Sequence, residues 1–209
     1  MREIRAAVIA LVAVSLVFGL AYPLAMTGVG QTVFGGAADG SIVKRDSKAV
    51  GSKLIGQDFS RDTGRKNDEG EPILAPDLNY FQSRPSATGY SASATFFNNL
   101  GPNQNDLADA LKANVKTYLD REKPTTPGLR AATIPADAVT TSASGVDPDI
   151  SEDNARIQTN RVAERRGLNR TRVLALVDEH TSHPLLGLAG AGSVNVLELN
   201  LALDRESTR

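Results

Sequence analysis

The sequence predicts an α+β protein with a single N-terminal transmembrane helix and one extracytoplasmic α+β domain. A long apolar run opens the chain, and nothing later in the sequence resembles it. Amphipathic stretches with helical spacing follow further along the chain. Short apolar runs bounded by turn residues accompany them, a pattern that is typical of short strands.

The N-terminal anchor is predicted from residues 6–27, which carry no charge. As a helix rising 1.5 Å per residue, this run would span about 33 Å, enough to cross a hydrocarbon core of roughly 30 Å. Tyr22 and Pro23 lie near its outer end, where an interfacial aromatic residue and a helix-ending proline are expected. Ser15 and Gly19 share a face four residues apart, a small-xxx-small pattern that favours close approach of another helix.

The charges around this run predict its orientation. Arg2 and Arg5 precede it, opposed only by Glu3, and Lys44 is the first basic residue after it. The positive-inside rule then places the N-terminus in the cytoplasm and the bulk of a single-pass cell-membrane protein outside. A cleaved signal peptide is the alternative, but its apolar core is normally about 7–15 residues long, and no A-x-A site precedes Gly28. A buried core helix is disfavoured because no polar face interrupts the run.

Composition limits the function of the remaining residues. They hold 44 of the 47 charged residues, 21 basic and 23 acidic, so they lack the basic excess expected of a nucleic-acid-binding domain. The chain has no cysteine, which excludes disulfides and cysteine-ligated metals. It has no tryptophan and only ten aromatic residues, so a site that stacks sugars or bases is poorly supported.

The chain divides into three predicted parts. Residues 1–27 form the anchor, residues 28–41 are a Gly- and Ala-rich juxtamembrane connector, and residues 42–209 form the soluble domain. The domain is expected to begin with short strands at residues 42–43 and 50–55 around a charged turn.

Three further segments are predicted to be loops, turns or extended chain. Residues 61–71 are hydrophilic without apolar periodicity, so we expect an exposed loop or insertion. Residues 79–90 are turn-rich and hold two adjacent aromatic residues, and residues 126–151 contain several prolines.

Three helices are predicted from capping residues and apolar spacing. The first is capped by Asn105 and closed at residues 123–124. The second is opened by Ser151 and stopped by Gly167, a natural left-handed cap, and the third is capped by Asn169. Their expected inward-facing apolar residues are Leu107, Leu111, Val115, Tyr118 and Leu119, then Ile157 and Val162, then Val173, Leu176 and Val177.

The C-terminal residues 193–204 are predicted as a strand inside the sheet. Leu197, Leu199, Leu201 and Leu203 alternate strictly with other residues. That period of two is typical of a strand with one buried face.

Candidate catalytic or metal-binding residues are few. His180 and His183 form an H-x-x-H pair, but a zinc site needs three or four convergent ligands, and the helix that would align this pair is ending. Residues 140–151 are rich in hydroxyls and carry Asp147 and Asp149, yet they show neither a nucleophile elbow nor EF-hand spacing. We expect a tight loop there, held by hydroxyl and Asx turns. No phosphate-binding loop is present, so no directly bound cofactor is expected.

Segments spread over nearly the whole chain match one known family in order and spacing. They are residues 22–24 (YPL), 39–41 (DGS), 51–59 (GSKLIGQDF), 80–87 (YFQSRPSA), 99–102 (NLGP), 134–135 (IP), 139–151 (VTTSASGVDPDIS) and 194–204 (VNVLELNLALD). Together they resemble the C subunits of bacterial potassium-transporting P-type ATPases, the KdpC family. The chain departs from the family pattern at residues 61–77, an insertion that some members lack, and at residues 182–183 and 190–193.

The resemblance implies a non-catalytic subunit of a complex that uses ATP to take up K⁺ with high affinity. The implied partners are a P-type subunit that hydrolyses ATP, a channel-like subunit that binds K⁺, a small membrane subunit and membrane lipid, without nucleic acid. The family is described as raising the ATP affinity of the P-type subunit and as stabilising the complex. The candidate partner interface comprises Ser15, Gly19, Tyr80, Phe81, Arg84, Pro85, Thr140, Ser142, Ser144 and Asp147.

The residues themselves leave two other functions open. A membrane-anchored extracytoplasmic serine hydrolase would pair a serine of residues 140–144 with His180 or His183, which must then lie within hydrogen-bond reach. The sensor domain of a signalling protein would need a cytoplasmic output module, and only five residues precede the uncharged run.

Overall fold

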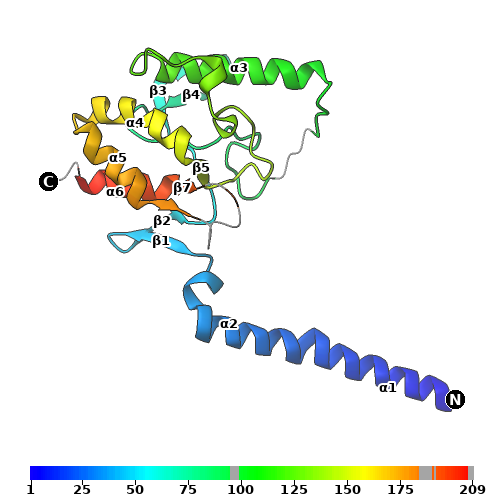
Figure 1. Ribbon diagram of the computed structural model, residues 1–209. Coiled ribbons are helices and arrows are strands. Elements are labelled where there is room, and N and C mark those ends of the chain that lie inside the picture. Colours follow the sequence, from blue (N-terminus) through cyan, green and yellow to red (C-terminus); the bar gives the residue numbers. More distant parts are fainter. Residues whose placement is uncertain (95–98, 184–189, 191, 207–209) are drawn as a thin grey trace. The chain divides into compact units, whose positions relative to one another are not determined.

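Figure 1 shows the computed structural model, which describes residues 1–94, 99–183, 190 and 192–206. The chain forms two compact units, Met1–Ser52 and Lys53–Arg209. The first holds one long apolar helix and a hairpin, and the second combines helices with small sheets. This arrangement confirms the predicted α+β class with an N-terminal candidate membrane helix.

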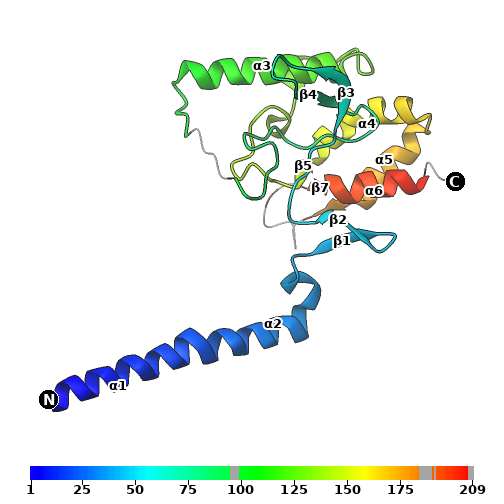
Figure 2. The same cartoon turned by 180° about the vertical axis from the view of Figure 1, so that it is seen from behind.

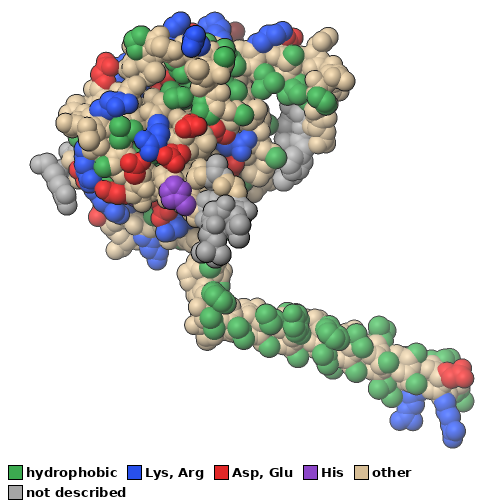
Figure 3. Space-filling view, viewed as in Figure 1, with side chains coloured by type: hydrophobic (Ala, Val, Ile, Leu, Met, Phe, Trp, Pro, Cys, Tyr) green, Lys and Arg blue, Asp and Glu red, His purple; other side chains and the backbone are tan. Residues whose placement is uncertain are grey.

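The N-terminal helix is longer than its uncharged core predicted. It runs through α1 (Arg2–Leu16), a π-helical turn (Val17–Ala21) and α2 (Tyr22–Ala38). The whole of Arg2–Ala38 is long and apolar enough to cross a membrane, and its most apolar stretch is not buried within the structure. Apolar side chains cover the visible face of this helix, and basic side chains lie at its N-terminal end (Figure 3).

The expectation that Pro23 ends this helix is wrong, because the helix continues to Ala38. A proline lacks the N–H donor, and its ring collides with the carbonyl group four residues earlier. The π-helical turn immediately before Tyr22 widens the helix at this point and accommodates the ring. The predicted connector is therefore helical for most of its length, with a kink at Phe34 (φ −127°, ψ 33°).

The first hairpin follows the helix, as predicted. Strands β1 (Ile42–Arg45) and β2 (Lys48–Ser52) pair antiparallel. Asp46 and Ser47 form the turn with positive φ angles of 49° and 65°, the backbone twist that two-residue hairpins favour.

Residues 61–71 do not form the predicted loop, because they belong to a second hairpin. Strands β3 (Ser60–Lys66) and β4 (Pro72–Pro76) pair antiparallel. Most of β3 is exposed, so it shows no apolar alternation that would reveal a strand. Asn67 fixes the turn, because its side-chain oxygen accepts hydrogen bonds from the backbone N–H groups of Glu69 and Glu71.

Three helices form where capping residues predicted them: α3 (Asn105–Glu122), α4 (Glu152–Arg166) and α5 (Arg170–Glu179). Ser151 accepts a hydrogen bond from the N–H group of Asn154 at the start of α4. Gly167 ends α4 in the left-handed conformation (φ 63°), and Asn169 caps α5. Asn105 is the first residue of α3 rather than its cap, because Gln104 precedes the helix with extended backbone angles. Short 3₁₀ turns occupy Ala131–Thr133 and Ala136–Ala138.

The predicted C-terminal strand is wrong. Only β7 (Ser193–Asn195) is extended, and α6 (Val196–Glu206) follows it. The alternating leucines also fit a helix, because Val196, Leu199, Asn200 and Leu203 recur at intervals of three and four and are all buried. The short β7 pairs antiparallel with β5 (Asp149–Ser151) and β6 (Thr181–Ser182), giving the order β5-β7-β6.

Two apolar clusters hold the second unit together. The larger one joins α4, α5, α6 and β7, which lie together in both views (Figures 1 and 2). Phe81 enters it from a loop and is fully buried. The smaller cluster packs Tyr118 of α3 against Leu129, Ala138 and Val139. The loops that carry the candidate site are therefore attached to two rigid cores.

Candidate functional site

The two loops of the candidate interface contact each other. Arg84 Nη1 donates to Asp147 Oδ2 at 2.8 Å, and Arg84 Nη2 donates to Thr140 Oγ1 at 3.3 Å. The backbone N–H group of Ser142 donates to the carbonyl of Pro85 at 2.9 Å. Residues that are distant in the sequence thus form one surface.

A third segment passes beneath this contact and completes the loop junction, which we define as residues 56–57, 82–88 and 140–147. The Gly56 N–H group donates to the carbonyl of Val146 at 2.7 Å. A Cβ atom at Gly56 would collide with the carbonyl group of Asp147, so only glycine fits here. Ser83 Oγ donates to the carbonyl of Gln57 at 3.2 Å.

A glycine turn closes the other end of the loop junction. Gly145 adopts a positive φ of 72°, and its carbonyl accepts a hydrogen bond from Ser86 Oγ at 2.6 Å. Thr88 packs so closely on Gly145 that a Cβ atom would lie 2.5 Å from the threonine hydroxyl. Within the described part of the chain, Arg84 Nε is the one buried side-chain nitrogen or oxygen without a hydrogen-bond partner.

A buried ion pair supports the residues that precede the loop junction. Arg161 of α4 and Glu122 of α3 are 1% and 0% exposed, and Arg161 Nε lies 3.1 Å from both carboxylate oxygens of Glu122. Arg161 also donates to the carbonyls of Leu78 and Tyr80 and to the side-chain oxygen of Gln158. Burial lowers the pKa of Arg161, and the Glu122 carboxylate opposes that effect. Because the guanidinium donates to two backbone carbonyls, it fixes the path of the chain at residues 78–80.

Gln158 extends this support to the loop junction itself. Its side-chain oxygen accepts a hydrogen bond from the Gln82 N–H group at 2.8 Å, and its Nε2 donates to the Gln82 carbonyl at 3.1 Å. Gln158 Nε2 also donates to Asn154, which accepts the hydroxyl proton of Tyr118. Burial and the nearby Glu122 carboxylate raise the pKa of Tyr118, so its hydroxyl stays protonated as a donor.

The predicted interface residues have different surroundings. Tyr80 is partly buried, its hydroxyl donates to Asp204 at 3.1 Å, and the guanidinium of Arg166 lies 4.5 Å from its ring centroid. Phe81 and Ser142 are buried, so their side chains support the surface from beneath. Partly buried or exposed positions are Arg84, Pro85, Thr140, Ser144 and Asp147. Ser15 and Gly19 lie on the separate N-terminal helix, where both are exposed.

Sequence reasoning missed the buried polar residues Glu122, Gln158 and Arg161. Charged and amide residues on amphipathic helices normally face water. The partners that tie them to other elements are 39 to 83 residues away in sequence, so no local pattern indicated these contacts. The local signal was the loop itself, since Arg161 bonds to the backbone of Tyr80 and Gln158 bonds to the backbone of Gln82.

His180 and the serines of the hydrolase hypothesis have other partners. His180 Nδ1 lies 2.8 Å from the carbonyl of Leu176, one turn earlier in α5. Ser142 and Ser144 bond to each other at 3.2 Å. Over residues 1–94, 99–183, 190 and 192–206, no hydrogen bond joins these serines to His180 or His183, and no group of three His, Cys, Asp or Glu residues is placed to hold a metal ion.

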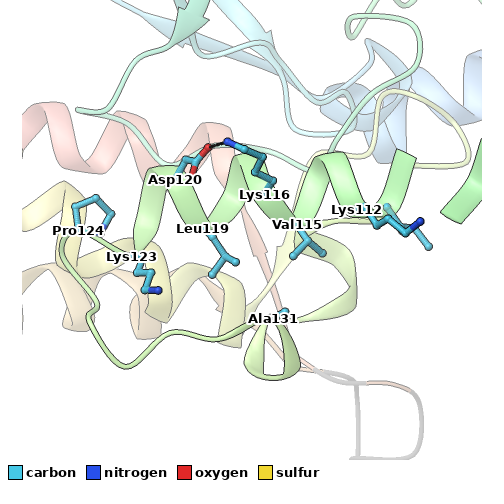
Figure 4. A pocket seen from close by; sticks show the side chains of 9 residues that line it. Lys112, Val115, Lys116, Leu119, Asp120, Lys123, Pro124 and Ala131 are labelled. Carbon is cyan, nitrogen blue, oxygen red and sulfur yellow. Dashed lines mark hydrogen bonds and ion pairs between the residues drawn. The ribbon is translucent and has the colours of Figure 1, made fainter. Parts of the chain in front are cut away.

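A separate apolar groove of about 880 Å³ runs along α3. Figure 4 shows Val115 and Leu119 on the side of α3 that faces Ala131, and the ion pair between Lys116 and Asp120 on its other side. The charged residues that line the groove are Lys112, Lys116, Asp120 and Lys123.

Fold and site together define an α+β protein with one candidate membrane helix and with polar loops that hydrogen-bond to one another. The chain belongs to the KdpC family, described as K⁺-transporting ATPase, c chain, whose model matches residues 4–205. It is 45% identical over 211 residues to the potassium-transporting ATPase KdpC subunit of Bradyrhizobium diazoefficiens, with both chains covered completely. The KdpC subunit of Rhodopseudomonas palustris (strain TIE-1) is 42% identical with complete coverage of both chains. That of Caulobacter vibrioides (strain NA1000 / CB15N) is 45% identical, over 97% of this chain and 92% of the relative.

These matches confirm the family resemblance that the sequence segments indicated. The chain is accordingly a KdpC subunit of a K⁺-transporting ATPase. The hydrolase and sensor hypotheses are set aside.

Proposed function

We propose that the chain is a non-catalytic accessory subunit that stabilises a high-affinity, ATP-driven K⁺ uptake complex and assists its ATP-hydrolysing P-type subunit. The loop junction is the observation that carries this proposal. Its polar groups bond to one another across three segments, which makes a pre-ordered surface. Such a surface loses little conformational entropy when a partner binds to it.

The proposed topology is a single-pass cell-membrane protein with its N-terminus in the cytoplasm. The long apolar helix supports the membrane anchor. The basic residues Arg2 and Arg5 at its start support the orientation through the positive-inside rule. In this arrangement Lys53–Arg209 lies outside the cytoplasm, and Ser15 and Gly19 lie within the bilayer, where a partner helix can approach.

The proposed partners are the P-type subunit, a channel-like K⁺-binding subunit and a small membrane subunit. The exposed part of the loop junction, with Arg84, Thr140, Ser144 and Asp147, is the proposed contact surface. In this role the chain binds neither K⁺ nor ATP itself. A lid over the ion entrance is a second role for the same surface.

An effect on ATP affinity would have to be indirect in this topology. A domain outside the membrane cannot touch a cytoplasmic nucleotide. The chain would instead favour one conformation of the pump, through differential contacts made by its anchor helix or by the loop junction.

A pull-down tests this function. The tagged full chain is purified in gentle detergent from potassium-starved cells, and accompanying proteins are identified by mass spectrometry. We expect a P-type ATPase and a channel-like membrane protein in stoichiometric amounts. Recovery of the chain alone, as a stable monomer, would contradict the proposal.

A further inference from the structure

A polar cavity borders the loop junction and shares Gln82, Ser83 and Pro85 with it. It has a volume of about 240 Å³ and is lined by residues from β3, β4, α3 and the loop of residues 82–90. Arg121 of α3 contributes the positive charge on its wall, and Asp58 lies on the wall as well. Ser60, Ser83 and Thr117 are among the other residues that line the cavity.

Contacts from the described residues fix the guanidinium of Arg121 but engage only one of its nitrogen atoms. Its Nε donates to Glu122 at 2.6 Å, and its guanidinium lies 5.1 Å from the ring centroid of Tyr118. These two contacts fix the plane of the guanidinium. In the part of the chain that the structure describes, no acceptor is bonded to Nη1 or Nη2 of Arg121. Its side chain is only 15% exposed, so few water molecules reach those donors.

The charge of Arg121 is not cancelled by Glu122 alone. Glu122 also receives Arg161 through both of its carboxylate oxygens, so two guanidinium groups share one buried carboxylate. Asp58 is the other negative group at the cavity, but it is exposed to solvent and its Oδ1 accepts the N–H group of Ser60. Arg121 is less exposed to water than Asp58, so solvent weakens the field of its charge less. The inner wall of the cavity therefore keeps a positive charge.

The same helix supplies a further hydrogen-bond donor at the cavity. Thr117 lies one helical turn before Arg121 on α3, and no bond engages its hydroxyl within the described residues. A planar guanidinium with two free nitrogen atoms and a neighbouring hydroxyl is the donor set that carboxylate and phosphate oxygens require.

We propose that this cavity, the Arg121 pocket, binds a small oxyanion, which is either a carboxylate or inorganic phosphate. The anion accepts from Arg121 Nη1 and Nη2 and from Thr117 Oγ1, while Nε stays bonded to Glu122. The anion is free in solution, or it is an acidic side chain of a partner subunit. An acidic side chain of a partner as the anion rests on the proposed function, whereas a free anion does not.

Titration of the full chain in detergent with inorganic phosphate, followed by calorimetry, tests the pocket. We expect saturable binding, weakened at least about tenfold by Arg121→Gln, since two charge-assisted hydrogen bonds are lost. Arg121→Lys keeps the charge but not the paired donors, so it restores binding only in part. Lys112→Gln is the matched control on the same helix, because Lys112 is exposed outside the pocket, and it should bind phosphate like the wild type.

A second variant guards against misfolding. Thr117→Val keeps the shape of the side chain and removes one donor, so we expect phosphate binding about threefold weaker with an unchanged melting temperature. Absence of saturable phosphate binding by the wild-type chain, or equal binding by the wild type, Arg121→Gln and Thr117→Val, would overturn the proposal and indicate an adventitious ion only.

The assembled complex distinguishes the two sources of the anion. If the anion is free, the complex binds phosphate as the isolated chain does. If a partner's carboxylate fills the pocket, the complex does not bind phosphate, and Arg121→Gln lowers recovery of the chain with the complex. Both results keep the pocket as an oxyanion site, and neither depends on whether the loop junction is a contact surface.

Discussion

The guanidinium of Arg84 lies 2.8 Å from the carboxylate of Asp147 and joins two loops 63 residues apart. Both side chains are partly exposed, at 24% and 30%, so the pair is accessible to solvent. Asp147 is also held from its own loop, since its Oδ1 accepts the N–H group of Asp149. The pair therefore connects a loop whose shape is already fixed to the backbone that Arg161 holds in place.

Removing the charge of Asp147 should loosen the loop junction. We expect Asp147→Asn to lower the free energy of unfolding by about 1–3 kcal/mol, because a partly buried charge-assisted hydrogen bond is lost. Recovery of the chain with its complex should fall as well. Lys112→Gln, which breaks an exposed pair with Asp109, should change stability by less than about 1 kcal/mol. Unchanged recovery of Asp147→Asn would remove the loop junction from the contact surface.

The buried pair between Arg161 and Glu122 should contribute more than any surface pair. We expect Arg161→Met or Glu122→Gln alone to cost about 3–5 kcal/mol, since each removes one charge of a buried ion pair. The double variant should cost less than the sum of the single variants. Denaturant unfolding of all four proteins gives this coupling. Additive costs would mean that the two groups are stabilised independently.

The ends of α4 were predictable because their determinants are local. Ser151 and Gly167 act within one turn of the helix that they bound. The C-terminal strand was mispredicted because Leu197, Leu199, Leu201 and Leu203 satisfy a period of two, while the buried positions satisfy the helical period. Packing against α5 and β7 decides between the two, and that information lies elsewhere in the chain.

The sequence indicated which segments form the candidate site, but it did not indicate that these segments contact each other. The sequence indicated residues 80–87 and 139–151, yet no spacing rule places Arg84 beside Asp147. Phe81 was predicted to belong to the partner interface together with the rest of its loop. The structure buries it, since the Asn200 side chain bonds to both its N–H and its carbonyl group and draws the loop onto α6.

The helix caps should contribute measurable stability. Ser151→Ala removes both the hydrogen bond from Asn154 and the bond to Asp137, so we expect a loss of about 1–2 kcal/mol. Asn169→Ala, which removes only the cap of α5, should cost about 1 kcal/mol. Thermal or denaturant unfolding measures both. A larger cost for Asn169→Ala than for Ser151→Ala would contradict the importance of Asp137.

Stability should fall at high pH because of Tyr90. Burial, and then the negative charge of Asp58, raise the pKa of Tyr90 to about 12, while Arg121 opposes this shift. An unfolded tyrosine has a pKa of about 10. The stability that Tyr90 contributes is therefore complete below about pH 10 and is lost as the pH rises through about 12. Tyr90→Phe should show a shallower decline in unfolding free energy over this window, measured by denaturant unfolding at several pH values; equal slopes would contradict the shift.

The absence of native cysteine makes the proposed topology directly testable. Asp68 lies in the exposed turn between β3 and β4, and Glu3 lies at the start of α1. In intact cells, a membrane-impermeant maleimide should label an Asp68→Cys variant and leave a Glu3→Cys variant unlabelled, because the positive-inside rule keeps Arg2 and Arg5 in the cytoplasm. Permeabilised cells provide the control, where both variants should react. Labelling of Glu3→Cys alone in intact cells would reverse the orientation, and the domain would then have direct access to the cytoplasmic nucleotide.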